Sequence, residues 1–228
     1  MTHNAVPGFL PSEQGLRFRN TFPKGPVIEL PGGIGIGDAS LGLCGGMVLT
    51  TRDLFEAGIA PPPDTEPPAR GTRRFRAIVR RQAQSLDWLR VPLRYWDLQA
   101  LRPAPRLRRR SAGEESLCRW LPRIRAEIDA GRTPVVGLIR EQGLSPLRLT
   151  HNHQTLAFAY DEYPDGVALR VYDPNHPGRD DVTIGAMVTP DAGRPSGRRI
   201  TLRQSTGEPL AGFFLQPYPR PDAIGAWR

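Results

Sequence analysis

A cysteine beside three glycines opens a helix-like pattern in the first quarter of the chain. Residues 42–46 read Gly-Leu-Cys-Gly-Gly, and apolar side chains then recur at helical spacing from Met47 to Phe55. A thiol in the first turn of a helix lies near free backbone N–H groups and the positive end of the helix dipole, and both favour the thiolate. Free cysteines are also common as small buried apolar residues. The glycines favour a reactive Cys44, because they would clear side chains from around the sulfur and let a substrate backbone approach.

A histidine and a carboxylate far downstream could complete a site for nucleophilic catalysis. His153 opens a strand-like run over 153–160, and Asp173 follows the next strand-like run. The turn residues at 164–166 would join the two runs as antiparallel neighbours, which would place His153 and Asp173 side by side. A cysteine, a histidine and a carboxylate are the residue types of a nucleophile, its base and the group that orients the base. Asn175 is the competing orienter, because its amide oxygen could also accept the imidazole N–H.

The net charge raises the question of a nucleic-acid partner. The formal charge is +8, and Lys24 is the only lysine. Guanidinium groups pair well with phosphate. The arginines are spread from Arg17 to Arg228, however, and the one dense run, at 106–110, comes without interleaved aromatic residues or zinc-finger spacing. We therefore expect a bias of arginine over lysine and no nucleic-acid binding.

Cysteine usage and the N-terminus bear on the compartment. The two cysteines, Cys44 and Cys118, cannot form a disulfide-rich scaffold, so a reducing compartment fits, although a single bridge between them stays compatible with the sequence. The N-terminus lacks a charged start followed by an apolar core, and no apolar run approaches the length of a membrane span. We expect a cytoplasmic protein without a signal peptide or a membrane partner, and the oligomeric state stays open.

Three helical patterns occupy the first part of the chain. The first runs from Cys44 to Ala57 and stops at Gly58. The second begins after a Thr72 cap, and the third begins at Ser111, which forms a capping-box pattern with the glutamate three residues later. A proline at position 122 interrupts the third pattern, which predicts either two short helices or one that restarts there.

After residue 132 the apolar period changes from that of helices to that of strands. Strands are predicted over 135–139, 153–160, 167–172, 182–188, 198–204 and 211–218. Helices first and strands second indicate an α+β fold with a mostly antiparallel sheet. We expect one domain over 1–228, made of an N-terminal extension (1–42) with a strand-like piece at 27–30, a helical lobe (43–131) and a sheet lobe (132–228).

The order of these features resembles the papain-like cysteine peptidases, and above all their bacterial branch that includes the bacteriocin-leader peptidases. In that branch a Gly-Tyr pair ends seven positions after the histidine, where this chain has Ala159-Tyr160. Asp173-Pro174 matches the Asp-Pro that ends the following strand of that branch, and residues 131–136 match its Gly-to-Pro approach to a buried strand. The match covers roughly residues 38–174. The resemblance implies a papain-like fold, with the nucleophile helix packed on the sheet.

The resemblance also implies a function. It implies a cysteine hydrolase, a peptidase or amidase that acts on a peptide or amide through a thioester intermediate and needs no cofactor. Cys44 would be the nucleophile, His153 the base and Asp173 the orienter. Hydrolysis and acyl transfer both remain open, as does the identity of the substrate.

One departure from the family concerns the group that would stabilise the oxyanion. The family often has a glutamine six residues before the cysteine, where this chain has Asp38, whose charge would oppose a developing oxyanion. Asp38 and Asn175 are candidates for a role at the oxyanion or in support of the triad, and Asn20 and Gln154 are candidates for the missing donor. The alternative hypothesis is a binding or interaction module on the same fold with little or no catalysis.

A metal site is a further alternative. The His-x-His pattern of His151 and His153, with Asp173 or His176, could form a histidine and carboxylate site. This spacing occurs often without any metal. We therefore predict no metal ligands.

Overall fold

The computed structural model describes residues 2–25, 28–30, 34–36, 42–87, 90–100, 111–140, 152–193, 196–219 and 224–227. Its helices are α1 (Pro11–Gln14), α2 (Cys44–Glu56), α3 (Arg73–Ser85), α4 (Arg90–Ala100), α5 (Ala112–Glu115), a π-helical turn (Ser116–Trp120), α6 (Leu121–Asp129) and a final 3-10 turn (Ile224–Ala226). Its strands are β1 (Thr2–Ala5), β2 (Ile28–Leu30), β3 (Ile34–Ile36), β4 (Val135–Ile139), β5 (His153–Tyr163), β6 (Gly166–Tyr172), β7 (Thr183–Pro190), β8 (Arg198–Gln204) and β9 (Gly212–Leu215).

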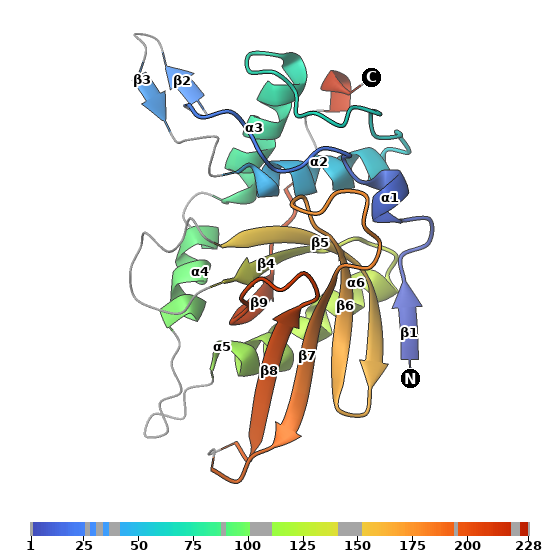
Figure 1. Cartoon of the computed structure of the whole chain (residues 1–228), viewed down its shortest axis with the longest axis vertical. Helices are drawn as coiled ribbons and strands as arrows, with labels where there is room; N and C mark the ends of the chain where they lie inside the picture. The colour runs from blue at the N-terminus through green and yellow to red at the C-terminus, as the bar shows by residue number, and fades with distance from the viewer. Residues whose placement is uncertain are drawn as a thin grey trace.

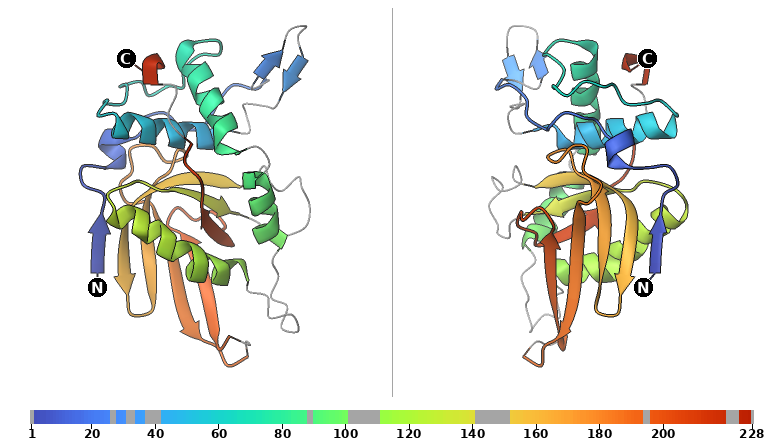
Figure 2. Two further views of the ribbon diagram at one scale, coloured as in Figure 1. Left: turned by 180° about the vertical axis from the view of Figure 1, so that it is seen from behind. Right: turned by 45° about the vertical axis from the view of Figure 1, so that its right-hand side comes forward.

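The expected α+β arrangement of N-terminal helices on a C-terminal antiparallel sheet is confirmed (Figure 1). In the part of the chain that the structure describes, seven strands form one sheet in the order β8-β7-β6-β5-β4-β9, and β1 pairs with β5. Every pairing in this sheet is antiparallel. Figure 2 shows α2 and α3 at one end of the sheet and α6 across its back. The strand on which α2 packs is β5, whose first residue is His153.

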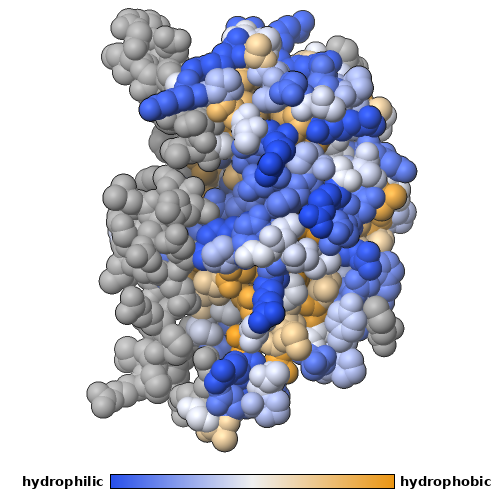
Figure 3. Space-filling view, in the orientation of Figure 1, coloured by the Kyte–Doolittle hydropathy of each residue, from blue (hydrophilic) through white to orange (hydrophobic). Residues whose placement is uncertain are grey.

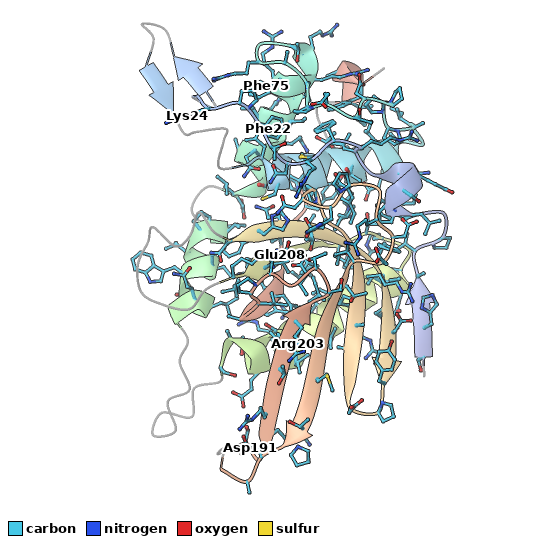
Figure 4. All side chains as sticks on the ribbon, viewed as in Figure 1. Phe22, Lys24, Phe75, Asp191, Arg203 and Glu208 are labelled. Atoms are coloured by element: carbon cyan, nitrogen blue, oxygen red, sulfur yellow. The ribbon has the colours of Figure 1, made fainter. Side chains whose placement is uncertain are left out.

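Helices α2 and α3 form the upper part of the molecule and share a small apolar core. The α3 helix begins as predicted, with the Thr72 hydroxyl accepting a hydrogen bond from the Phe75 N–H at 3.2 Å. Phe75 and Ile78 of α3 are buried, and Phe22 from the N-terminal segment packs against Phe75 with ring centroids 6.0 Å apart (Figure 4). Met47 of α2 joins the same cluster. The core therefore attaches α2 to α3 and to the segment before α2.

The helical run after residue 110 resolves the choice that the proline at position 122 left open. Ser111 forms the predicted capping box with Glu114. The run then widens into a π-helical turn, where the N–H of Leu121 donates to the carbonyl of Ser116, five residues earlier. Pro122 lacks an N–H and its ring crowds the carbonyl four residues back, so the helix widens just before it and continues as α6.

Helix α4 and the strands β1 and β3 are among the elements that the sequence analysis did not predict. Helix α4 contains Pro92 in its first turn, which a proline tolerates but which obscures the helical pattern. Strand β1 has no alternating apolar pattern, and it is held by pairing with residues 159–162 of β5. Strand β3 pairs with β2, the predicted strand-like piece. The first residues of the chain thus contribute a strand to the main sheet.

The structure also bears on membranes and on the outer surface. None of the described helices has the length and apolar character needed to cross a lipid bilayer. On the face seen in Figure 3, hydrophilic side chains cover much of the helical part, and apolar side chains are most visible over the strands.

The contact between α2 and α3 yields a prediction about stability. A Cβ at Gly46 would lie 2.2 Å from the backbone oxygen of Ile78, so Gly46→Ala forces the two helices apart. We expect the free energy of unfolding to fall by about 2 kcal/mol in urea titrations, despite the better helix propensity of alanine. Gly185→Ala on β7, whose Cβ would meet only Arg203 O at 3.8 Å, should stay within about 0.5 kcal/mol of the unmodified chain. Equal stability of the two variants would contradict the close packing at Gly46.

Candidate functional site

Cys44 is the first residue of α2 and is half-buried. The turn before it requires glycine, since Gly42 has φ +90° and a Cβ there would lie 2.5 Å from Asn20 Nδ2. The N-terminus of the helix leaves backbone donors without carbonyl partners inside the helix, and one of these is the N–H of Cys44. The sequence pattern thus places a thiol at the positive end of a helix dipole.

The glycines after Cys44 were expected to leave space for a substrate backbone, but the structure fills that space with protein atoms. A Cβ at Gly45 would lie 2.2 Å from Ser85 Oγ and 2.6 Å from Gln154 Oε1. The space beside Gly46 is filled by the backbone of Ile78. The room that these glycines make is therefore taken by α3 and β5, and not by an open path for a substrate backbone. Their effect is to bring the start of α2 close to the start of β5.

His153 and Asp173 lie together in the interior, where the ends of β5 and β6 meet. Their side chains are joined by a 2.7 Å contact between His153 Nε2 and Asp173 Oδ1. Asp173 is fully buried and His153 is 5% exposed. The antiparallel pairing of β5 with β6, in which Leu156 stands opposite Tyr172, brings the two residues to the same edge. The carboxylate holds the imidazole at Nε2 and leaves Nδ1 as the ring nitrogen for the thiol.

The electrostatics of the three groups favour a thiolate beside an imidazolium. Burial alone would raise the pKa of Cys44, but the hydrogen bond with His153, the charge of His153 and the N–H groups of Gln154 and Gly45 lower it overall. Burial would lower the pKa of His153, but the charge and hydrogen bond of Asp173, with the contribution of Cys44, raise it to about 10. The pKa of Asp173 is held far below its usual range, because the contacts with His153 outweigh its burial.

Asn175 does not orient the imidazole. Its backbone N–H donates to Asp173 Oδ1 at 2.8 Å, and its side-chain oxygen accepts from Asn20 Nδ2 at 3.2 Å. Asn20 in turn accepts the N–H of Leu43 at 2.6 Å and donates its own N–H to the Pro174 carbonyl at 2.9 Å. Asn20 therefore clamps the turn before Cys44 to the loop after Asp173.

The other candidates for an oxyanion donor are placed as follows. Asp38 lies outside the described residues. The Gln154 side chain donates from Nε2 to Ser85 Oγ at 3.3 Å, while its backbone N–H bonds to the sulfur of Cys44. The Asn20 amide is engaged in the clamp. The N–H of Cys44, which has no carbonyl partner inside the helix, remains the candidate donor.

Of the groups of the metal alternative, the structure brings His153 and Asp173 together, and these two side chains are engaged with each other. His151 lies outside the described residues, and His176 Nε2 contacts Glu208 Oε1 at 2.7 Å. Among the described residues no group of three or more histidine, cysteine or acidic side chains is arranged to hold a metal ion.

Sequence reasoning missed the residues that surround the histidine. The Tyr95 hydroxyl of α4 donates to the His153 carbonyl at 2.8 Å and accepts from Gln216 Nε2 at 2.9 Å. Gln204 Nε2 donates to Asp173 Oδ2 at 2.7 Å, and Arg140 Nη1 donates to Gln204 Oε1 at 2.6 Å. Tyr95 was missed together with its helix. Gln204 ends a predicted strand, and a polar residue at such an end was the signal that could have drawn attention to it.

The Asn20 clamp generates a prediction. Asn20→Ala leaves the Leu43 N–H and the Asn175 side chain without their partners, so we expect a loss of about 1–3 kcal/mol in the free energy of unfolding. The amide of Leu43 should also exchange its hydrogen faster. The matched control is Asn4→Ala, which removes an exposed bond to Asp129 and should cost no more than about 0.5 kcal/mol. Unchanged exchange at Leu43 would show that Asn20 does not hold the turn.

Comparisons with protein-family models, with curated proteins and with solved structures found no match to this chain.

Proposed function

We propose that this chain is a cysteine hydrolase of the peptidase or amidase type, built on a papain-like arrangement of a nucleophile helix and an antiparallel sheet. The observation that carries the proposal is the buried pair of His153 and Asp173 beside a thiol at the start of α2. Each of these groups has a pKa displaced in the direction that nucleophilic catalysis needs. Burial by itself would disfavour the ionised forms of all three groups, because an ionised group loses hydration in the interior. Their mutual contacts reverse this effect.

The arrangement supports a two-step reaction. The Cys44 thiolate attacks the carbonyl carbon of an amide, and the N–H of Cys44 donates to the oxygen that becomes negative. His153 gives its Nδ1 proton to the leaving nitrogen, the C–N bond breaks, and a thioester remains on Cys44. His153 then takes a proton from water, whose oxygen attacks the thioester and releases the acid and the thiolate. Asp173 stays ionised throughout and stabilises the imidazolium, as in other triads.

One prediction of this proposal concerns the reactivity of the Cys44 thiol. Iodoacetamide at pH 6 should alkylate Cys44 at least about tenfold faster than the exposed Cys118, because the lowered pKa of Cys44 keeps its thiolate populated there. Peptide mapping by mass spectrometry measures both rates in one sample. His153→Ala should abolish the preference, whereas His176→Ala, which removes a histidine bonded to Glu208, should keep it. Equal, slow labelling of both cysteines in the unmodified chain would refute the proposed chemistry.

Another prediction distinguishes a cysteine hydrolase from a binding module on the same fold. With p-nitrophenyl acetate, the Cys44 thiolate should displace p-nitrophenolate in a burst of about one equivalent and carry an acetyl thioester. The rate of the burst should fall at low pH as Cys44 is protonated, because the thiolate is the attacking group. The turnover that follows should rise with pH as His153 loses its proton from the pKa that Asp173 raises, because the neutral imidazole takes the proton from water. Cys44→Ala should show no burst, and Cys118→Ala a full one. A full burst without turnover would favour the binding module, and the absence of a burst in the unmodified chain would count against both catalytic steps.

A further inference from the structure

Two buried polar side chains connect the Asp173 carboxylate to a second cation. Gln204, the last residue of β8, is 4% exposed, and Arg140, directly after β4, is 9% exposed. Gln204 Nε2 donates to Asp173 Oδ2, and Gln204 Oε1 accepts from Arg140 Nη1. Arg140 also donates to the carbonyl of Pro209 at 3.2 Å. A continuous chain of bonds thus runs from Arg140 through Gln204 and Asp173 to His153.

The orientation of the Gln204 amide follows from the chemistry of its neighbours. A guanidinium can only donate hydrogen bonds and a carboxylate can only accept them. Gln204 stands between the two, so its oxygen must face Arg140 and its NH₂ group must face Asp173. Oδ2 therefore receives a fixed donor, while Oδ1 serves His153 and the backbone N–H of Asn175. Both oxygens of the carboxylate are held, which fixes its plane and hence the direction of the imidazole.

The charge of Arg140 balances the buried site. With Cys44 as thiolate, Asp173 as carboxylate and His153 as imidazolium, the three groups carry one excess negative charge. Burial lowers the pKa of Arg140, and the charges of Asp173, Glu208 and Cys44 oppose this, which shows that these groups lie within electrostatic reach. An arginine stays protonated in proteins, so Arg140 brings the sum over the four groups to zero.

Two further titratable groups, Tyr95 and Glu208, act on Arg140. Tyr95 stays neutral, because burial and the charge of Cys44 raise its pKa well above the ordinary value. Glu208 contacts His176, on the loop after Asp173. Neither group replaces the positive charge of Arg140. Loss of that charge would leave excess negative charge around Cys44, which disfavours the thiolate.

We propose that Gln204 and Arg140 are positioning residues of the site, where Gln204 fixes the Asp173 carboxylate and Arg140 fixes Gln204 and supplies the charge that keeps Cys44 ionised. This inference rests on the cysteine chemistry proposed above. It assigns roles to two residues that touch neither the thiol nor a substrate. Its test is therefore the pH dependence of thiol reactivity, which a purely structural role would leave unchanged.

The sharpest variant is Gln204→Glu, which keeps the size of the side chain and an acceptor for Arg140. It replaces the donor that faces Asp173 Oδ2 with an oxygen, so two carboxylates confront each other. The measured quantity is the rate of Cys44 alkylation by iodoacetamide between pH 4.5 and 10, and its acid limb is the fall of this rate at low pH. We expect the midpoint of the acid limb to move up by about one pH unit and the rate at pH 6 to fall about tenfold. Arg203→Gln, the preceding and exposed position on β8 (Figure 4), is the matched control and should leave the profile unchanged.

Arg140 is tested with a pair of variants that differ in charge. Arg140→Met should move the acid limb upward by a similar amount, whereas Arg140→Lys retains the charge and should recover most of the shift. The double variant Arg140→Met/Gln204→Leu should be less impaired than the sum of Arg140→Met and Gln204→Leu measured singly, because both changes interrupt one chain of bonds. Circular dichroism identifies any variant that fails to fold, and the isosteric Gln204→Glu decides the question if Arg140→Met does not fold.

The outcomes separate this inference from the function on which it rests. A low acid limb in the unmodified chain that is unchanged in Gln204→Glu and Arg140→Met would overturn the positioning roles and leave the hydrolase proposal standing. An acid limb at the ordinary thiol value of about 8.5 in the unmodified chain would overturn both. An upward shift in Arg203→Gln equal to that in Gln204→Glu would also overturn the positioning role, because it would show a general effect of β8.

Discussion

Asp173 holds the imidazole of His153 through a 2.7 Å contact in a place where neither residue is more than 5% exposed. An isolated imidazolium would lose its proton at such a depth, because burial disfavours the charged form. The carboxylate reverses that preference, and the resulting imidazolium lowers the pKa of Cys44 in turn. The same contact occupies Nε2, which leaves Nδ1 as the nitrogen for the thiol. One buried bond thus sets the protonation of the site and the direction of its ring, and the rest of the fold is required to place its two partners and the sulfur.

Close backbone packing provides that placement. The sulfur belongs to a helix and the imidazole to a strand, so the two meet only if α2 lies close to β5. Gly45 permits this approach, because Ser85 and Gln154 fill the volume that a Cβ would need. Gly46 does the same for α3 through the backbone of Ile78. The geometry of the site therefore depends on the absence of side chains at Gly45 and Gly46 as much as on the reactive side chains themselves.

The sequence allowed the main elements and the central residues to be predicted, because each depends on a local pattern. The apolar period predicted α2, α3 and the strands from β4 to β9, and the hairpin between β5 and β6 was enough to bring Asp173 beside His153. The misses have long-range causes. Tyr95 lies on a helix whose Pro92 obscured its pattern, and Gln204 reaches Asp173 from a strand two places away in the sheet. The use of the space at Gly45 was also wrongly assigned, since its neighbours come from α3 and β5, far along the chain. No local pattern encodes such contacts.

Segments near both ends of the chain connect the helical part to the sheet. The site requires this connection, because its sulfur lies on a helix and its imidazole on a strand. At the N-terminal end, β1 pairs with β5, and Asn20 bonds both to the turn before Cys44 and to the loop after Asp173.

At the C-terminal end, the segment after β9 returns to the helices, where the Tyr218 hydroxyl donates to Asp53 Oδ1 of α2 at 2.7 Å. The fully buried Arg81 of α3 donates to the same oxygen at 2.9 Å and to the Pro219 carbonyl at 3.2 Å. Burial raises the pKa of Asp53 to about 6 even with these donors, so the ionised carboxylate is stable there only while the returning segment stays in place. The alignment of Cys44 with His153 is thus supported by contacts that come from segments near both ends of the sequence, since one clamps the turn before the sulfur and the other holds the buried carboxylate of the nucleophile helix.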